Sequence, residues 1–296
     1  MIDIVRNYLQ LWAIQLVPAL LPYMIITTFI LELSNRYLSI NAKCNISKTI
    51  YSFPLSLTAL FILLAGHLCG YPIGAKLISD AYNNKNLTLE ESNFLNAVCN
   101  QASPAFLNFY VGKYILNGII PSSSIYIVFY TSTIITIVLM GSIYLSHKKI
   151  QHEDVIKSSH NADFSIMQLL DNIISSCCIT ILKIGGYIIL FSLINEFILQ
   201  LFPDSCTFLK VLFSSLEITS GLSLIKSCDI PNTLLVPAVL SITAFGGFCT
   251  MAQIKGMLSR TSLSIIPYII GKIFYMIIVF IISLLFIKIK VFSFNV

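Results

Sequence analysis

Charged residues are scarce in this sequence, at 10% of 296 residues, whereas hydrophobic residues make up 56%. The mean hydropathy is +0.86. Because an ordinary soluble domain has about a quarter of its residues charged, this composition excludes that class and is typical of a polytopic membrane protein. The apolar runs are long enough for about six crossings of roughly 20 residues each, with shorter apolar pieces between them.

The sequence also lacks the patterns that carry most cofactor and nucleic-acid chemistry. Its eight cysteines form no CxxC pair, and no histidine is spaced to bind zinc with them. The lysines and arginines do not gather in a basic patch with interleaved aromatic residues. No nucleophile, base and orienting group can be named as a set. We therefore expect no enzyme activity, no metal or other cofactor, and no nucleic-acid partner.

What the sequence does contain is a membrane segment that breaks. Residues 66–76 follow directly on the apolar run 57–65 and include three glycines, a proline and a lysine. Backbone groups freed in hydrocarbon cost several kcal/mol each, so such a break is expected only where protein or a water-filled cavity satisfies them. The segment therefore predicts a re-entrant hairpin and indicates a solute pathway.

The chain divides into a first repeat (1–146), a polar linker (147–165) and a second repeat (166–296). Residues 22–32 align with residues 186–196, with a tyrosine and a glutamate in register. Each half reads as a span, an interrupted segment, a helix broken by polar residues, and a span. If each interrupted segment returns to its own side, the two halves lie in opposite orientation. Inverted repeats with paired broken helices are the sequence pattern of a secondary transporter with its site at the bilayer midplane.

The spans and breaks have expected positions. The first span, residues 8–33, is expected to be retained rather than cleaved, and kinked at its prolines. The broken helices are expected at residues 100–104 and 243–247, and Gly70 and Gly221 are expected at the two hairpin tips.

The first interrupted segment contains candidate solute-binding residues. Its glycines allow two half-helices to approach closely, and Pro72 suits the start of the returning half-helix. That N-terminus carries partial positive charge and free N–H donors, which suit a carboxylate or phosphate, and Lys76 adds a full charge. In the alternative interpretation, the glycines form a packing face and Lys76 extends to the membrane interface. The candidates are Gly66, Gly70, Tyr71, Pro72, Gly74 and Lys76.

The polar break of the first half adds Asn100, Gln101 and Ser103. Pro104 removes an N–H there, so nearby carbonyls are expected to be exposed beside the amide side chains. This arrangement suits a polar solute or a cation. The alternative is a set of ordinary hydrogen bonds between helices.

In the second half, Glu217 lies in an apolar run, and an intramembrane carboxylate is a functional candidate by default. The alternative places it near a membrane surface. An ionised Glu217 would repel an anionic solute, so it must be protonated, paired, or bound to a coupling cation such as a proton or sodium. The second-half candidates are Glu217, Thr219, Ser220, Gly221, Gly246, Gly247, Thr250 and Gln253.

The first-half motif GxxxGYPxGAK, residues 66–76, is followed by CNQxSP at residues 99–104. Together with residues 184–192 and 245–247, these motifs resemble the sporulation-type integral membrane proteins that carry nucleoside-recognition or Gate repeats. Those proteins are distantly similar to concentrative nucleoside transporters. The resemblance implies a solute site formed by hairpins and broken helices, and one branch is linked to moving dipicolinic acid towards the developing spore.

The sequence thus predicts an all-α polytopic membrane protein of two inverted repeats, with re-entrant hairpins and broken helices. We expect it to transport a small polar or anionic solute across the bilayer by alternating access. Dipicolinate is the first expected solute and a nucleoside-like molecule the second. The rival interpretation is a non-transporting membrane scaffold for spore envelope assembly. The expected location is the cell membrane, or a forespore membrane as the resemblance suggests, and a homo-oligomer is left open.

Overall fold

The structure, a computed structural model, describes residues 2–37, 55–145, 165–201, 213, 215–226 and 228–289. Within these residues every regular element is a helix, which confirms the all-α prediction. Four helical segments are long and apolar enough to cross a bilayer: Ser122–Tyr144, Ile166–Leu201, Asn232–Leu258 and Ile266–Lys288. The protein is therefore an integral membrane protein. Two shorter apolar helical stretches, Leu20–Leu33 and Leu57–Cys69, fall below that length, so the described residues contain fewer full-length spans than the six expected.

The N-terminal helix runs through α1 (Ile2–Gln10), the π-helix η1 (Leu11–Leu16) and α2 (Val17–Tyr37). The π-helix ends next to Pro18, where the sequence predicts a kink. The Val17 N–H bonds to the Trp12 carbonyl, five residues back, and Pro18 has no N–H to donate to the helix ladder. Trp12 also ties this helix to α8 (Ile166–Leu201), since its indole N–H donates to the Ile181 carbonyl at 3.0 Å.

The rest of the first half contains the expected hairpin and broken helix. Helix α4 (Leu57–Cys69) ends at Gly70, whose φ of +80° suits a residue without a side chain, and α5 (Ile73–Asn83) returns along it. Helix α6 (Leu89–Val98) ends before an unwound stretch, after which the π-helix η2 (Phe106–Ile115) continues. The last element of this half is α7 (Ser122–Tyr144).

After α8, the second half contains α10 (Ile218–Lys226), α11 (Asn232–Phe245), α12 (Gly247–Leu258) and α13 (Ile266–Lys288). Helices α11 and α12 are separated only by Gly246, so together they form the second broken helix. The predicted break at residues 243–247 is confirmed.

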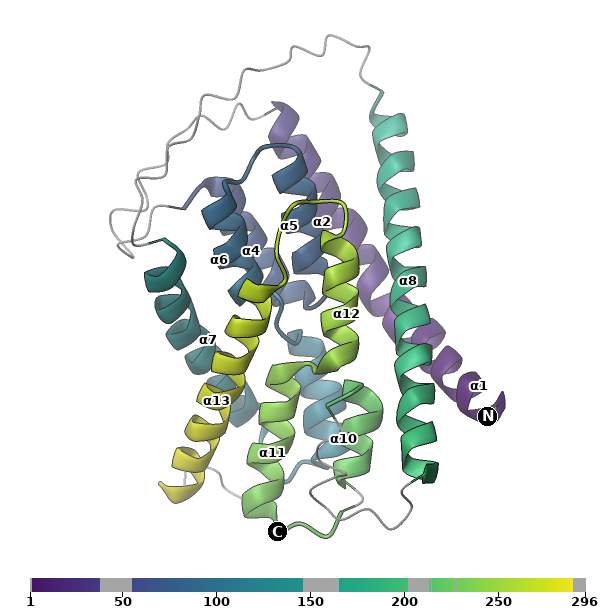
Figure 1. Ribbon diagram of the computed structural model, residues 1–296, viewed down its shortest axis with the longest axis vertical. Coiled ribbons are helices and arrows are strands. Elements are labelled where there is room, and N and C mark those ends of the chain that lie inside the picture. The colour runs from purple at the N-terminus through teal and green to yellow at the C-terminus, as the bar shows by residue number, and fades with distance from the viewer. Residues whose placement is uncertain are drawn as a thin grey trace.

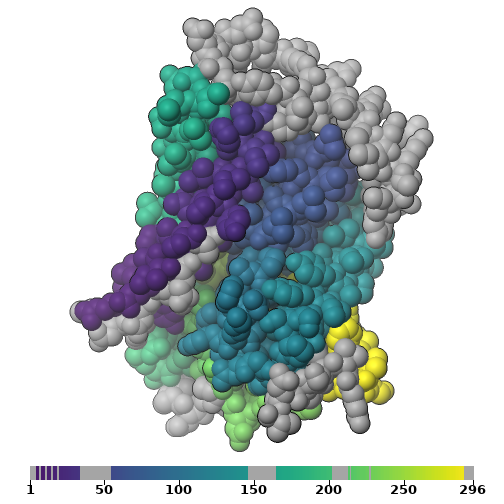
Figure 2. Space-filling model, turned by 180° about the vertical axis from the view of Figure 1, so that it is seen from behind, coloured from purple at the N-terminus to yellow at the C-terminus, as the bar shows by residue number. Residues whose placement is uncertain are grey.

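Figure 1 shows how these elements are arranged along the long axis of the molecule. The hairpin of α4 and α5 lies towards one end, beside α12, and α10 lies towards the other end, beside α11. Helix α8 runs along most of this axis, and Figure 2 shows the N-terminal helix crossing one face obliquely, with its first turns projecting beyond the body. The inverted-repeat relation and the domain boundaries stay predictions, and residues 147–164 of the polar linker lie outside the described residues.

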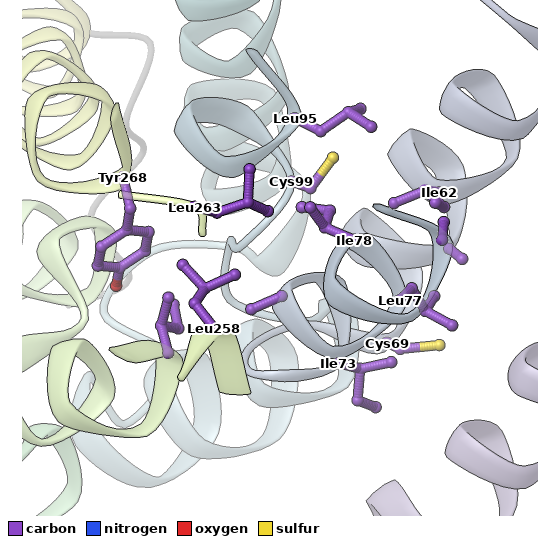
Figure 3. Packing of buried hydrophobic residues seen from close by; sticks show 14 of the residues in the cluster. Ile62, Cys69, Ile73, Leu77, Ile78, Leu95, Cys99, Leu258, Leu263 and Tyr268 are labelled. Atoms are coloured by element: carbon purple, nitrogen blue, oxygen red, sulfur yellow. The ribbon is translucent and has the colours of Figure 1, made fainter. Parts of the chain in front are cut away.

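The largest apolar cluster joins the two halves. Ile73, Ile78 and Cys99 of the first half lie in one cluster with Leu258 and Tyr268 of the second, as Figure 3 shows. Glycine permits helices of the two halves to approach closely. At Gly271 in α13 a side chain would collide with the Ala97 carbonyl of α6, so the absence of one sets the crossing of these two helices.

We predict that Gly271→Ala destabilises the protein by about 1–3 kcal/mol, because the added methyl has no room against the Ala97 backbone. The matched control is Gly186→Ala in α8, where an added Cβ meets nothing within 4 Å. Thermal unfolding of the purified protein in detergent checks the difference. Equal unfolding temperatures for the two variants would contradict the proposed close contact.

Candidate functional site

In the first half, the tip of the hairpin is docked into the helix break. The Tyr71 N–H donates to the Gln101 carbonyl at 3.1 Å. A Cβ added at Gly70 would lie 2.9 Å from the Ser103 nitrogen, and one at Gly66 would lie 2.7 Å from the Cys99 oxygen. Such contacts leave no space for side chains. The hairpin thus satisfies the Gln101 carbonyl of the break, as backbone at membrane depth requires.

The N-terminus of α5, predicted as an anion site, is occupied by a side chain of the protein. Pro72 is its N-cap, as expected, and the Asn100 side-chain oxygen accepts the Ala75 N–H at 2.8 Å. A Cβ at Gly74 would lie 2.8 Å from that same oxygen. Asn100 therefore acts as a cap supplied from another helix. Ser103 has a similar local role, since its hydroxyl accepts the Phe106 N–H at 3.3 Å at the start of η2.

The second break is built by two glycines with positive φ, +83° at Gly246 and +84° at Gly247. The Phe248 N–H turns away from the helix and donates to the Ser215 carbonyl at 2.8 Å, and the Cys249 N–H donates to the Leu216 carbonyl at 2.9 Å. In a continuous helix the Phe248 N–H would bond to the Ala244 carbonyl, four residues back. The break therefore frees the Ala244 carbonyl for another donor.

Two further candidates stabilise α12 near this break. The Thr250 hydroxyl donates to the Gly246 carbonyl at 2.7 Å, one turn back along the helix. The Gln253 amide donates to the Cys249 sulfur at 3.3 Å, and both Thr250 and Gln253 are buried. These contacts are local to α12.

Glu217 caps the next half-helix. Its carboxylate accepts the N–H groups of Thr219 at 3.1 Å and Ser220 at 2.8 Å, and the Thr219 hydroxyl at 2.6 Å. The carboxylate is buried at 2% exposure, and the partial positive charge of the α10 N-terminus favours it there. The Ser220 hydroxyl in turn accepts from the Asn195 amide of α8 at 3.1 Å.

The expectation that Gly221 lies at the second hairpin tip is wrong. Gly221 lies inside α10, where its N–H bonds to the Glu217 carbonyl at 2.9 Å. The contact with the broken helix is made by Ser215 and Leu216, just before α10. The apolar run around Gly221 marked the helix itself rather than the turn that precedes it.

The ammonium of Lys76 is paired within its own helix. Its ammonium forms an ion pair with Asp80 at 2.8 Å, one turn further along α5. Cys177 of α8 is an electrostatic neighbour of this pair. Asp80 therefore neutralises the ammonium that the sequence suggested as a partner for the solute.

The cation that does reach the breaks is Lys272, in the second turn of the apolar helix α13. Its Nζ donates to the Gln101 side-chain oxygen at 2.9 Å and to the freed Ala244 carbonyl at 3.1 Å. The side chain is 1% exposed. Lys272 therefore links the polar break of the first half to the glycine break of the second.

Three tyrosine rings surround this ammonium. Their centroids lie 5.7 Å (Tyr71), 5.8 Å (Tyr268) and 5.7 Å (Tyr275) from Nζ, within the range of a cation–π contact. Glu217 is an electrostatic neighbour of the Tyr71 hydroxyl. The candidate site therefore comprises Tyr71, Gln101 and the Ala244 carbonyl around Lys272, with Glu217 nearby.

Lys272 was not among the predicted site residues, although the sequence contains a signal for it. A lysine within the 23-residue apolar helix Ile266–Lys288 is itself a functional candidate, because intramembrane charges are costly and face the interior of the bundle. Candidate site residues were predicted only in the broken segments, and none was predicted in the last span of the second half.

One curated relative agrees with the membrane assignment. The chain is 24% identical over 304 aligned residues to the sporulation integral membrane protein YlbJ of Bacillus subtilis (strain 168), an alignment that covers 90% of this chain and 73% of the relative. No family model matches the chain, and no solved structure matches it. The similarity confirms the expected resemblance to sporulation-type integral membrane proteins, whereas the nucleoside-recognition repeats stay a prediction.

We predict that Asn100→Leu destabilises the protein by about 1–3 kcal/mol, because the buried Ala75 N–H loses its acceptor. Asn100→Asp keeps an acceptor oxygen at the N-terminus of α5 and should retain most of the stability. Thermal unfolding of the two variants beside the unaltered protein checks this expectation. A leucine variant as stable as the aspartate variant would show that the cap does not matter.

Proposed function

We propose that this protein is a membrane transporter for a small polar or anionic solute, which crosses between the hairpin tips and the two helix breaks by alternating access. The observation that carries the proposal is the junction at Lys272, where the first break, the second break and a buried charge meet. The similarity to a sporulation integral membrane protein supports the membrane setting.

Interrupted helices, positive-φ glycines and a buried lysine each disfavour a simple helical bundle in lipid. A structural protein has no need to bring all three to one place. A solute pathway needs them, because polar groups must face the solute where it passes the middle of the membrane.

Alternating access fits the positions of the hairpin and of α10. The α4–α5 hairpin lies towards one end of the molecule and α10 towards the other (Figure 1). The hairpin tip bonds to the first break through Tyr71, and the residues just before α10 bond to the second break through Ser215. Movement of either contact would open the central site to one side at a time. Glu217, at the start of α10, is the residue that we expect to couple such a movement to a proton or sodium ion.

The solute is expected to be dipicolinate first and a nucleoside-like molecule second, as the resemblance implies. The structure changes which residue would meet an anion. Both half-helix N-termini are occupied by Asn100 and Glu217, and Lys76 is paired with Asp80, which leaves Lys272 as the candidate cation. The second candidate function is a non-transporting scaffold, which the packing of α13 against α6 at Gly271 would also serve.

We predict that Glu217→Gln lowers the initial rate of solute uptake by about tenfold, because the amide cannot replace one charge-assisted hydrogen bond at the start of α10. The measurement is uptake of radiolabelled dipicolinate and of radiolabelled uridine into proteoliposomes, normalised to protein. Asp229→Asn, an exposed change between α10 and α11, serves as the matched control and should leave uptake unchanged.

Uptake of neither solute by the folded, unaltered protein would favour the scaffold. Equal uptake by the Glu217→Gln variant and the control would remove Glu217 from the pathway while leaving transport in place.

A further inference from the structure

The buried ammonium of Lys272 has no counter-ion in the part of the chain that the structure describes. The ion pair found there is Lys76–Asp80. Lys272 instead bonds to two neutral oxygens, those of Gln101 and Ala244. A buried charge without an opposite charge is strongly disfavoured, so this position is suited to a group that brings a negative charge with it.

Donors at this position also remain unused. A protonated lysine has three N–H donors, and two are taken up by Gln101 and Ala244. The hydroxyls of Tyr71 and Tyr268 are buried and have no hydrogen-bond partner among the described residues. The Tyr275 hydroxyl differs, because it donates to the Phe129 carbonyl at 3.2 Å and accepts from the Thr133 hydroxyl at 3.2 Å.

We infer that Lys272, together with the hydroxyls of Tyr71 and Tyr268, is the binding point for a carboxylate of the solute, an inference that rests on the proposed transport function. The carboxylate oxygens supply the acceptors that these three side chains lack, and its charge offsets that of the ammonium. The tyrosine rings around Nζ form flat apolar walls, so the body of the acid is expected to be planar or apolar. Gln101 and Ala244 hold the lysine in place when no solute is bound.

A carboxylate site at Lys272 requires the hydroxyls of Tyr71 and Tyr268 for affinity and not for the stability of the fold. Tyr71→Phe and Tyr268→Phe each remove a hydroxyl that has no partner in the protein, so neither variant should unfold at a lower temperature. Each should bind a carboxylate about tenfold more weakly or worse, because a hydrogen bond to a charged group is lost. Tyr126→Phe is the matched control, since its hydroxyl donates to the Pro104 carbonyl at 3.1 Å: its stability should fall while its affinity stays unchanged.

The experiment is equilibrium binding of radiolabelled dipicolinate to the purified full chain, with unlabelled benzoate as a competing monocarboxylate and uridine as a neutral probe. Lys272→Met should abolish dipicolinate binding, and Lys255→Met, at an exposed position of the neighbouring α12, should not change it. Benzoate should compete and uridine should not.

Two outcomes would overturn the inference while transport stands. One is dipicolinate binding that Lys272→Met and the two tyrosine variants leave unaltered, and the other is a site that binds uridine but no carboxylate. If the folded protein neither binds nor takes up any of the probes, the proposed function itself fails and the carboxylate site fails with it.

Discussion

The rest of the structure depends on one constraint, that backbone N–H and C=O groups cannot be left without partners in the interior of a membrane. Each half of the chain breaks a helix there and then satisfies the break with a second segment. Tyr71 meets Gln101 in the first half, and Phe248 meets Ser215 in the second. Glycines stand where these backbones approach, because a side chain would fill the space that the hydrogen bonds need. Lys272 also satisfies a backbone group, because it donates to the Ala244 carbonyl that the second break has freed.

Much of the fold follows from local sequence. Apolar run length and the positions of glycine and proline predicted the helix–break–helix pattern of α4 and α5, the broken helix of α11 and α12, and the spans α7 and α13. These features depend on few residues each, since a proline removes an N–H and a glycine permits positive φ wherever they occur. For this reason the breaks at Gly70 and Gly246 could be placed from the sequence.

The chemistry of the site could not be predicted in the same way, because it depends on pairs of residues far apart in the chain. Asn100 and Ala75 are 25 residues apart, and Lys272 and Gln101 are 171 apart. A single sequence shows that a polar side chain lies in an apolar segment, but not which partner it will meet. The sequence predicted Lys76 as a charge for the solute and Glu217 as a carboxyl that is protonated, paired or bound to a cation. It could not show that Asp80 lies beside the first and the start of α10 around the second. The prediction of Gly221 at a hairpin tip was wrong for a different reason, since a glycine in an apolar run can lie inside a helix as well as at its end.

The contact between the N-terminal helix and α8 has a practical consequence. Trp12 is the single tryptophan of the sequence, and it sits at Gly185 of α8 with its indole N–H on the Ile181 carbonyl. The ultraviolet emission of the protein, excited at the red edge of the indole band, thus originates from one place, where the first helix of the chain meets the first helix of the second half. Any sliding of these two helices against each other changes the polarity around that one ring, so the chain carries its own optical reporter of relative movement between its halves without a label being attached.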